Sequence, residues 1–120
     1  MTPDAPAATD VVTLATAQLA AYNAGDLSTF VACYHPDVVV WEDGEKTVEG
    51  RDKFRARYED LFSGSGFGAS VPGRLTEGRH CVDLEVWWRV HPDTLERTEG
   101  RILVRYTERD GLIATVQFLD

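Results

Sequence analysis

The hydrophobic pattern of this chain changes from a helical period to an alternating one at a glycine-rich segment, residues 63–68. Apolar residues before this segment recur at helical spacing, whereas after it they alternate along extended stretches. Helices grouped before consecutive strands predict an α+β fold rather than a parallel βαβ fold. Three helices cover only one face of a five-stranded sheet. We therefore expect a curved antiparallel sheet wrapped around N-terminal helices, forming a cone with a pocket.

Capping and turn residues set the expected boundaries of these elements. Thr9 or Asp10 caps a first helix, which ends at Gly25. Asp26 caps a short second helix that reaches Tyr34. The remaining expected elements are a turn at 35–37, a strand at 38–41 closed by residues 42–44, a helix at 51–62, and strands at 69–76, 80–90, 101–107 and 112–119.

Length and charge limit the organisation of the protein and its partners. The 120 residues fit a single domain, 9–120, preceded by a Pro/Ala-rich flexible tail, 1–8. A net charge of −8 argues against nucleic acid and anionic lipid as partners. No apolar run approaches a membrane span and no signal peptide is visible, which predicts a cytoplasmic protein. Cys33 and Cys81 are expected to be reduced, unbridged thiols.

The strand at 80–90 carries two alternating sets of side chains. His80 and Trp88 belong to the more apolar set, which we expect to face the interior. Trp87 would then lie with Leu103 on the outer face of the sheet. An apolar outer face is typical of an interface, so the pattern predicts a homodimer.

Several short motifs identify a family resemblance that covers residues 9–119. The chain resembles the nuclear-transport-factor-2-like superfamily, and within it the SnoaL-like and steroid delta-isomerase-like proteins. The motifs are Tyr22-Asn-Ala-Gly-Asp-Leu27 followed by Phe30 and Tyr34, Pro36-Asp37-Val-Val-Val, Val48-Glu-Gly-Arg51 and Arg109-Asp-Gly-Leu-Ile113.

The resemblance implies positions for catalytic groups. Ketosteroid isomerases use a carboxylate base, with a tyrosine and a protonated aspartate that hold the enolate oxygen. The base position falls on Glu42, the tyrosine position on Gln18, and a supporting tyrosine on Tyr58. The aspartate position falls near Leu103, where no acid is present. These departures predict that the protein is not a true ketosteroid isomerase.

The candidate catalytic residues are therefore Glu42, Gln18 and His80. Glu42 would be a general base with a raised pKa, because its carboxylate loses water in the apolar cone and lacks a basic partner on its own strand. Each has a structural alternative: an exposed strand end for Glu42, the edge of an apolar stripe for Gln18, and a hydrogen-bonded structural role for His80. The expected ligand-binding residues are Tyr22, Tyr34, Val40, Tyr58 and Trp88.

No metal or cofactor is predicted. His35 and His91 lie in separate turns, far in sequence from any cluster with metal-ligand spacing. The glycines at 64, 66 and 68 follow a helix instead of preceding one, which is typical of a linker.

Two hypotheses about the function stay open. The first is a cofactor-free isomerase, cyclase or hydratase acting on a small apolar carbonyl compound. The second is a non-catalytic ligand-binding or dimerisation module of the same fold.

Overall fold

The computed structural model describes residues 10–64 and 66–119, so the predicted tail at 1–8 lies outside the described residues. Three helices and six strands are present in the described part of the chain. In sequence order they are α1 (Val11–Ala24), α2 (Leu27–Ala32), β1 (Tyr34–Glu42), β2 (Glu45–Glu49), α3 (Arg51–Phe62), β3 (Phe67–Glu77), β4 (His80–Val90), β5 (Arg97–Arg109) and β6 (Leu112–Leu119).

The first two helices begin at predicted capping residues, and α1 also ends at the predicted one. The Asp10 carboxylate accepts a 2.8 Å hydrogen bond from the Thr13 N–H at the start of α1. Gly25 ends α1 at φ 69°, a left-handed conformation that glycine adopts without strain. The Asp26 carboxylate caps α2 through the N–H and hydroxyl of Thr29. Hydrogen bonds between neighbours in sequence, together with the glycine conformation, therefore set these boundaries of α1 and α2.

The chain from the end of α2 to α3 differs from the prediction in two ways. Tyr34 and the residues 35–37 belong to β1 instead of to a helix and a turn. Glu45–Glu49 forms an additional strand, joined to β1 by a tight turn in which Asp43 and Gly44 both have positive φ. Only Val48 of this strand is buried, so its sequence lacks the apolar alternation that identifies a strand.

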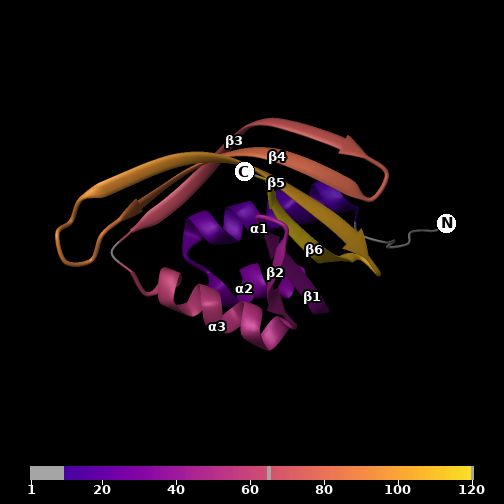
Figure 1. The fold of residues 1–120 in the computed structure, drawn as a ribbon, viewed down its shortest axis with the longest axis horizontal. Helices are drawn as coiled ribbons and strands as arrows, with labels where there is room; N and C mark the ends of the chain where they lie inside the picture. The colour runs from indigo at the N-terminus through magenta and orange to yellow at the C-terminus, as the bar shows by residue number, and fades with distance from the viewer. Residues whose placement is uncertain (1–9, 65, 120) are drawn as a thin grey trace.

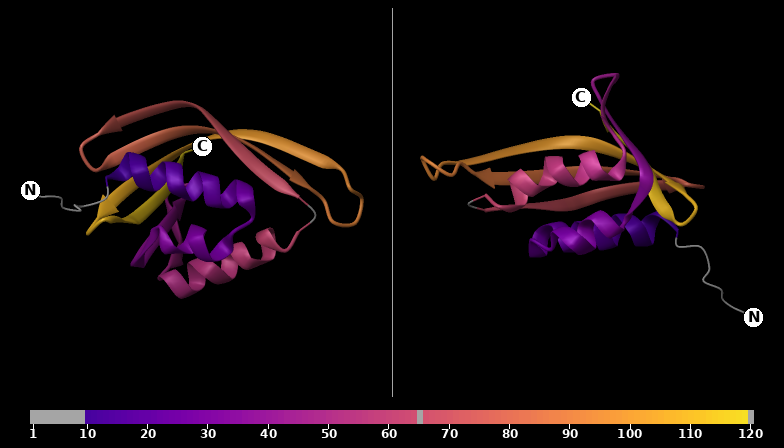
Figure 2. Two further views of the ribbon diagram at one scale, coloured as in Figure 1. Left: turned by 180° about the vertical axis from the view of Figure 1, so that it is seen from behind. Right: turned by 90° about the horizontal axis from the view of Figure 1, so that it is seen from below.

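The six strands form one curved sheet in the order β2-β1-β6-β5-β4-β3. The neighbours β1 and β6 run parallel and all other pairs are antiparallel, so the sheet is mixed. The helices lie together on the concave side of the sheet (Figures 1 and 2). This arrangement is the predicted α+β class with a curved sheet around the helices, but the sheet has one more strand than expected and is mixed instead of antiparallel.

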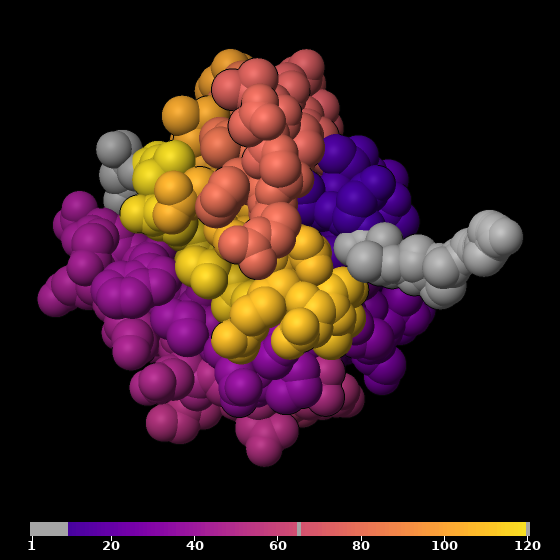
Figure 3. All heavy atoms as spheres, turned by 90° about the vertical axis from the view of Figure 1, so that its right-hand side faces the viewer, coloured from indigo at the N-terminus to yellow at the C-terminus, as the bar shows by residue number. Residues whose placement is uncertain are grey.

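Figure 3 shows one end of the molecule, where the curved sheet meets the first helix. Strands β5 and β6 lie there between α1 and the hairpin of β1 and β2 (Figure 3). The β4–β5 hairpin extends in the opposite direction, beyond the end of α3 (Figure 1). None of the helices in the described part of the chain is long and apolar enough to cross a membrane.

The predicted inner face of β4 is wrong: its odd-numbered residues face the helices. Cys81 and Asp83 are buried, and Glu85 and Trp87 continue the same face. Trp88 therefore points to the outer face. The prediction assigned the more apolar set of side chains to the interior. The inward-facing residues of this strand instead include the ion-paired Asp83 and residues that line a cavity.

The ion pair joins β3, β4 and α1. Arg74 Nε and Nη2 lie 2.7 and 3.0 Å from the two carboxylate oxygens of Asp83, and Nη1 donates to Thr16 Oγ1 at 2.8 Å. The Cys81 thiol also donates to Asp83, at 3.3 Å. Cys33 and Cys81 are both free, as predicted. Burial and the neighbouring carboxylate raise the pKa of Cys81 to about 11, so this thiol stays protonated.

Candidate functional site

The concave face of the sheet and the helices enclose a cavity of about 290 Å³, hereafter the central cavity. Seven of its fifteen wall residues are aromatic, including all four tyrosines of the chain, and four are charged. The volume is close to the lower end of the range typical of small-molecule sites, about 300–1,000 Å³. The aromatic wall residues are Tyr22, Phe30, Tyr34, Tyr58, Trp87 and Tyr106, with Phe118 at the edge.

A hydrogen-bond chain through Gln18 organises the polar part of this wall. The Tyr34 hydroxyl donates to Gln18 Oε1 at 2.9 Å, and Gln18 Nε2 donates to the Tyr106 oxygen at 3.3 Å. Gln18 Nε2 also donates to the carbonyl of Ala15 at 3.1 Å, which holds the amide in place. Because the Tyr106 oxygen accepts and no described residue accepts its proton, its hydroxyl is available to donate to a ligand.

Burial keeps these phenols protonated. It raises the pKa of Tyr34 and of Tyr106 well above the ordinary value, and it raises that of Tyr58 to about 12. A neutral phenol is a hydrogen-bond donor, whereas a phenolate is only an acceptor. The central cavity therefore presents donors to a ligand oxygen at neutral pH.

Glu42 lies at the mouth of the central cavity and is paired. Its Oε1 is 2.6 Å from Arg57 Nη1 and 2.7 Å from the Thr47 hydroxyl. The hydrogen bond from Arg57 lowers the Glu42 pKa. The predicted raised pKa is therefore wrong, because the basic partner comes from α3 and not from the strand of Glu42. The Glu42 side chain is 38% exposed, so solvent also favours its charged form.

Glu85 and Arg89 on β4 are cavity residues that sequence reasoning missed. Burial raises the Glu85 pKa, and the positive charge of Arg89 opposes this shift. The Arg89 guanidinium lies 5.2 Å from the centre of the Trp87 ring. The alternating pattern of β4 places Glu85 and Arg89 on the same face of the strand. Only the packing of the sheet shows that this face points inward.

The structure brings five of the eight predicted site residues together: Gln18, Tyr22, Tyr34, Glu42 and Tyr58 line the central cavity. Val40 is fully buried in the core and is not part of the cavity wall.

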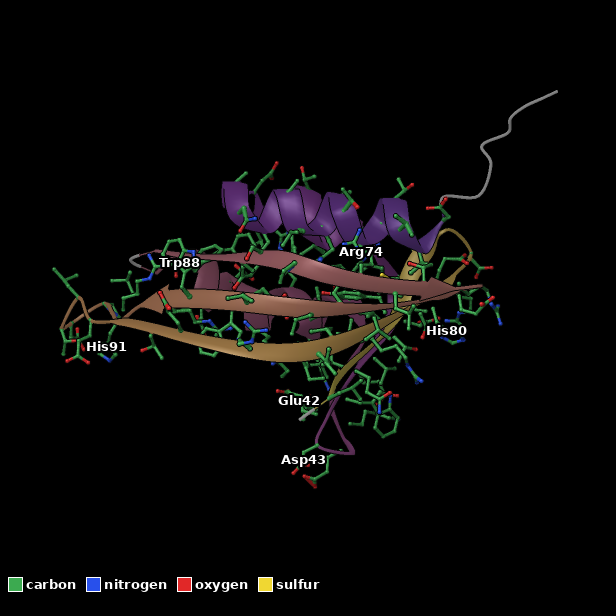
Figure 4. All side chains as sticks on the ribbon, turned by 90° about the horizontal axis from the view of Figure 1, so that it is seen from above. Glu42, Asp43, Arg74, His80, Trp88 and His91 are labelled. Carbon is green, nitrogen blue, oxygen red and sulfur yellow. The ribbon has the colours of Figure 1, made fainter. Side chains whose placement is uncertain are left out.

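Two predicted residues, His80 and Trp88, lie outside this group, because they belong to the outward face of β4. Figure 4 shows the sheet from outside, with Trp88 and His80 toward opposite ends. His80 is exposed, and its Nδ1 lies 3.2 Å from Thr107 Oγ1. The Trp88 ring packs against the guanidinium of Arg97, 4.5 Å from the ring centre. Trp87, predicted to lie outside, occupies the cavity wall in place of Trp88.

Solved structures show the same fold at low sequence identity. An uncharacterised cystatin fold protein from Novosphingobium aromaticivorans aligns with a TM-score of 0.83 and 20% identity, over 93% of this chain and 99% of that chain. Delta 5-3-ketosteroid isomerase from Mycobacterium sp. gives 0.81 and 18%, over 92% of each chain. A Mycobacterium tuberculosis protein in complex with estradiol-17beta-hemisuccinate gives 0.81 and 15%, over 91% and 92%.

Among curated protein sequences, no match to this chain is found. A model of the SnoaL-like domain matches residues 15–116, which span α1 through most of β6. The match includes all the residues that line the central cavity, except Phe118. Together with the shared fold, it shows that the chain belongs to the SnoaL-like family within the nuclear-transport-factor-2-like superfamily.

Proposed function

We propose that this protein binds a small, largely apolar carbonyl compound in the central cavity and acts on it as a cofactor-free isomerase, cyclase or hydratase. The observation that carries the proposal is the series of hydrogen bonds from Tyr34 through Gln18 to Tyr106. It leaves the Tyr106 hydroxyl free to donate to a ligand in the cavity. Such a donor stabilises negative charge that develops on a carbonyl oxygen, and its effect is larger where water is excluded.

One part of the central cavity wall fits the apolar body of a ligand. Phe30, Ile102, Val116 and Phe118 offer only hydrocarbon surface. The buried hydroxyls of Tyr34 and Tyr106 are fixed by Gln18, so a ligand without an acceptor leaves the remaining donor unpaired. A ketone or a related carbonyl compound satisfies both requirements.

The comparisons support the same class of ligand. One structural neighbour is a ketosteroid isomerase, and another binds estradiol-17beta-hemisuccinate. The enzyme name of the first and the ligand name of the second both refer to steroids, which have a large apolar body. Because the identities are below 25%, these neighbours support the class of ligand and not its identity.

A non-catalytic binding module is the second candidate. The pairing of Glu42 with Arg57 favours it, because an ion-paired carboxylate with a lowered pKa is a weak base. In this alternative the aromatic cavity and the Tyr106 donor hold the ligand, and no proton moves.

The binding of 1-indanone, a bicyclic ketone, tests the proposal against indane, the same skeleton without the oxygen. We expect 1-indanone to shift the backbone NMR signals around Gln18 and Tyr106. Tyr106→Phe should weaken this binding by about fivefold, equivalent to about 1 kcal/mol, and leave indane binding unchanged. Thr107→Val removes a hydroxyl on the opposite face of β5 and should have no effect. Equal affinity for the two compounds in the parent contradicts the proposed role of Tyr106.

The outer face of the sheet supports a homodimer as a further part of the proposal. Leu75 and Leu103 are 75% and 43% exposed, and Leu84 lies directly beside Leu103 across the β4–β5 pair. The contribution predicted for Trp87 is wrong, because its side chain faces the central cavity. A second copy of the chain would cover this apolar surface.

The free cysteines support the further proposal that the protein is located in a reducing compartment such as the cytoplasm.

A further inference from the structure

Glu85 is one of two carboxylates, with Glu42, on the wall of the central cavity. It lies on the concave face of β4, between the buried Asp83 and the cavity-lining Trp87. Tyr34, Tyr58 and Tyr106 line the same cavity, and their pKa values are raised mainly by burial and further by the Glu85 charge. A ligand in the central cavity is therefore within the reach of both the carboxylate and the phenols.

Glu85 differs from the other inward-facing carboxylates in having no partner among the described residues. Asp83 is held by two hydrogen bonds from Arg74, and Glu42 is held by Arg57 and Thr47. No described side chain donates a hydrogen bond to Glu85 or forms an ion pair with it within 4.0 Å. A structural carboxylate in a protein interior is normally paired. Glu85 instead lines the central cavity without such a partner, so a ligand bound there would lie beside it.

The groups around Glu85 set its protonation. Burial in the aromatic cavity raises its pKa, the Asp83 charge raises it further, and the Arg89 charge lowers it. Glu42 and Arg57 at the cavity mouth largely neutralise each other because they form an ion pair. The titratable and charged groups that face it are Asp83 and Arg89 on β4, Arg74 on β3, Tyr106 on β5, Tyr34 and Glu42 on β1, Tyr22 on α1, and Arg57 and Tyr58 on α3.

We infer that Glu85 is the group that removes a proton from the bound ligand and returns it, while the Tyr106 hydroxyl holds the ligand's carbonyl oxygen. This inference rests on the function proposed above. The Glu85 carboxylate takes the proton from the carbon next to the carbonyl group, and the electron pair of that C–H bond forms the carbon–carbon double bond of an enolate. The carbonyl π electrons move to the oxygen, where Tyr106 donates a hydrogen bond. Return of the proton to carbon restores a ketone and the Glu85 carboxylate.

The contrast with Glu42 explains why the proton carrier is Glu85. A base works best when its pKa lies near the working pH, and the pKa values of the two glutamates shift in opposite directions. Protonation of Glu42 would also remove the charge that holds its ion pair with Arg57, whereas Glu85 has no such bond to lose. The inner face of β4 therefore carries the role that sequence reasoning gave to the end of β1.

Hydrogen exchange on 1-indanone tests this role with the same probe as the binding experiment. In D2O, the protons on the carbon next to the carbonyl are replaced by deuterium only after the enolate forms, and the loss of their NMR signal gives the rate. We expect the parent protein to accelerate the exchange. Glu85→Gln should reduce the accelerated rate by about a hundredfold or more, the usual contribution of a general base, while 1-indanone still binds. Glu77→Gln changes an exposed glutamate at the end of β3 and should leave the rate unchanged.

The pH dependence separates a catalytic role from a structural one. The parent rate should rise with pH and level off above a pKa higher than the ordinary glutamate value of 4.5, and this step should be absent in Glu85→Gln. Thermal melting checks that the variant is folded. If the parent does not bind 1-indanone, the proposed function fails together with this inference. If it binds 1-indanone but does not accelerate the exchange, or if Glu85→Gln retains the parent rate and pH step, the inference about Glu85 is overturned and the binding function stands.

Discussion

Removing Arg74 is the perturbation whose cost follows most directly from the structure. Arg74 makes two hydrogen bonds to the Asp83 carboxylate, at 2.7 and 3.0 Å. The Asp83 side chain is only 2% exposed, so water cannot replace the guanidinium. Arg74→Met keeps most of the aliphatic stem but leaves a buried carboxylate with only the weak Cys81 thiol donor. We expect this variant to be strongly destabilised at pH 7.

The expected size comes from the cost of an uncompensated buried charge. Breaking a buried ion pair by removing one partner costs about 3–5 kcal/mol. Arg74 itself is 22% exposed, which places the loss near the lower end, about 3 kcal/mol. For a domain of this size, 1 kcal/mol lowers the melting temperature by about 4 °C, so Arg74→Met should melt about 12 °C below the parent.

Thermal and urea unfolding, followed by circular dichroism, measure this loss. The double variant Arg74→Met with Asp83→Leu removes the orphan charge, and it should recover more than half of the lost stability. Arg109→Met is the matched control, because its partner Asp37 lies 3.9 Å away and both side chains are exposed. Its effect should stay within about 0.5 kcal/mol. An Arg74→Met loss as small as that of the control, or a double variant no more stable than the single one, would refute the reasoning.

Three further perturbations test other parts of the structure. Glu42→Gln should lower stability at pH 7 by less than about 1 kcal/mol, because its pKa is lowered in the fold, and the loss should shrink as the pH falls below 4.5; a gain at pH 7 contradicts this. Gly100→Ala places a methyl group against the Trp87 indole, so tryptophan fluorescence should change and 1-indanone binding weaken, whereas Gly73→Ala, with room for a methyl group, should do neither. Sedimentation at micromolar concentration should give about twice 13.3 kDa for the parent and the monomer mass for Leu103→Glu; a monomeric parent rules out the dimer.

The sequence alone predicted the elements whose signals are local. The caps at Asp10 and Asp26, the left-handed Gly25 and the Asp110-Gly111 hairpin depend on hydrogen bonds and backbone angles within a few residues. The change of hydrophobic period predicted helices followed by strands, and hence the α+β class. The family motifs led to the same fold, which the SnoaL-like domain match and the solved structures show.

The site was only partly predictable. Gln18, Tyr22, Tyr34, Glu42 and Tyr58 were named from their positions and do line the central cavity. Their partners were not predictable, since the bonds from Tyr34 to Gln18 and from Arg57 to Glu42 join residues that are 16 and 15 positions apart. The pKa of Glu42 therefore moved opposite to the prediction once α3 supplied a guanidinium.

Only the tertiary structure decided which face of β4 points inward. Alternation divides the residues of the strand into two sets, one with Trp88 and the other with Glu85 and Trp87. Alternation alone does not show which set faces the interior. Hydrophobicity chose the wrong set, because the interior holds the Arg74–Asp83 pair and a ligand-sized cavity, while the apolar outer face stays half-exposed. The elements of this protein follow from interactions between neighbours in sequence, whereas its candidate chemistry follows from contacts between residues that only the folded sheet brings together.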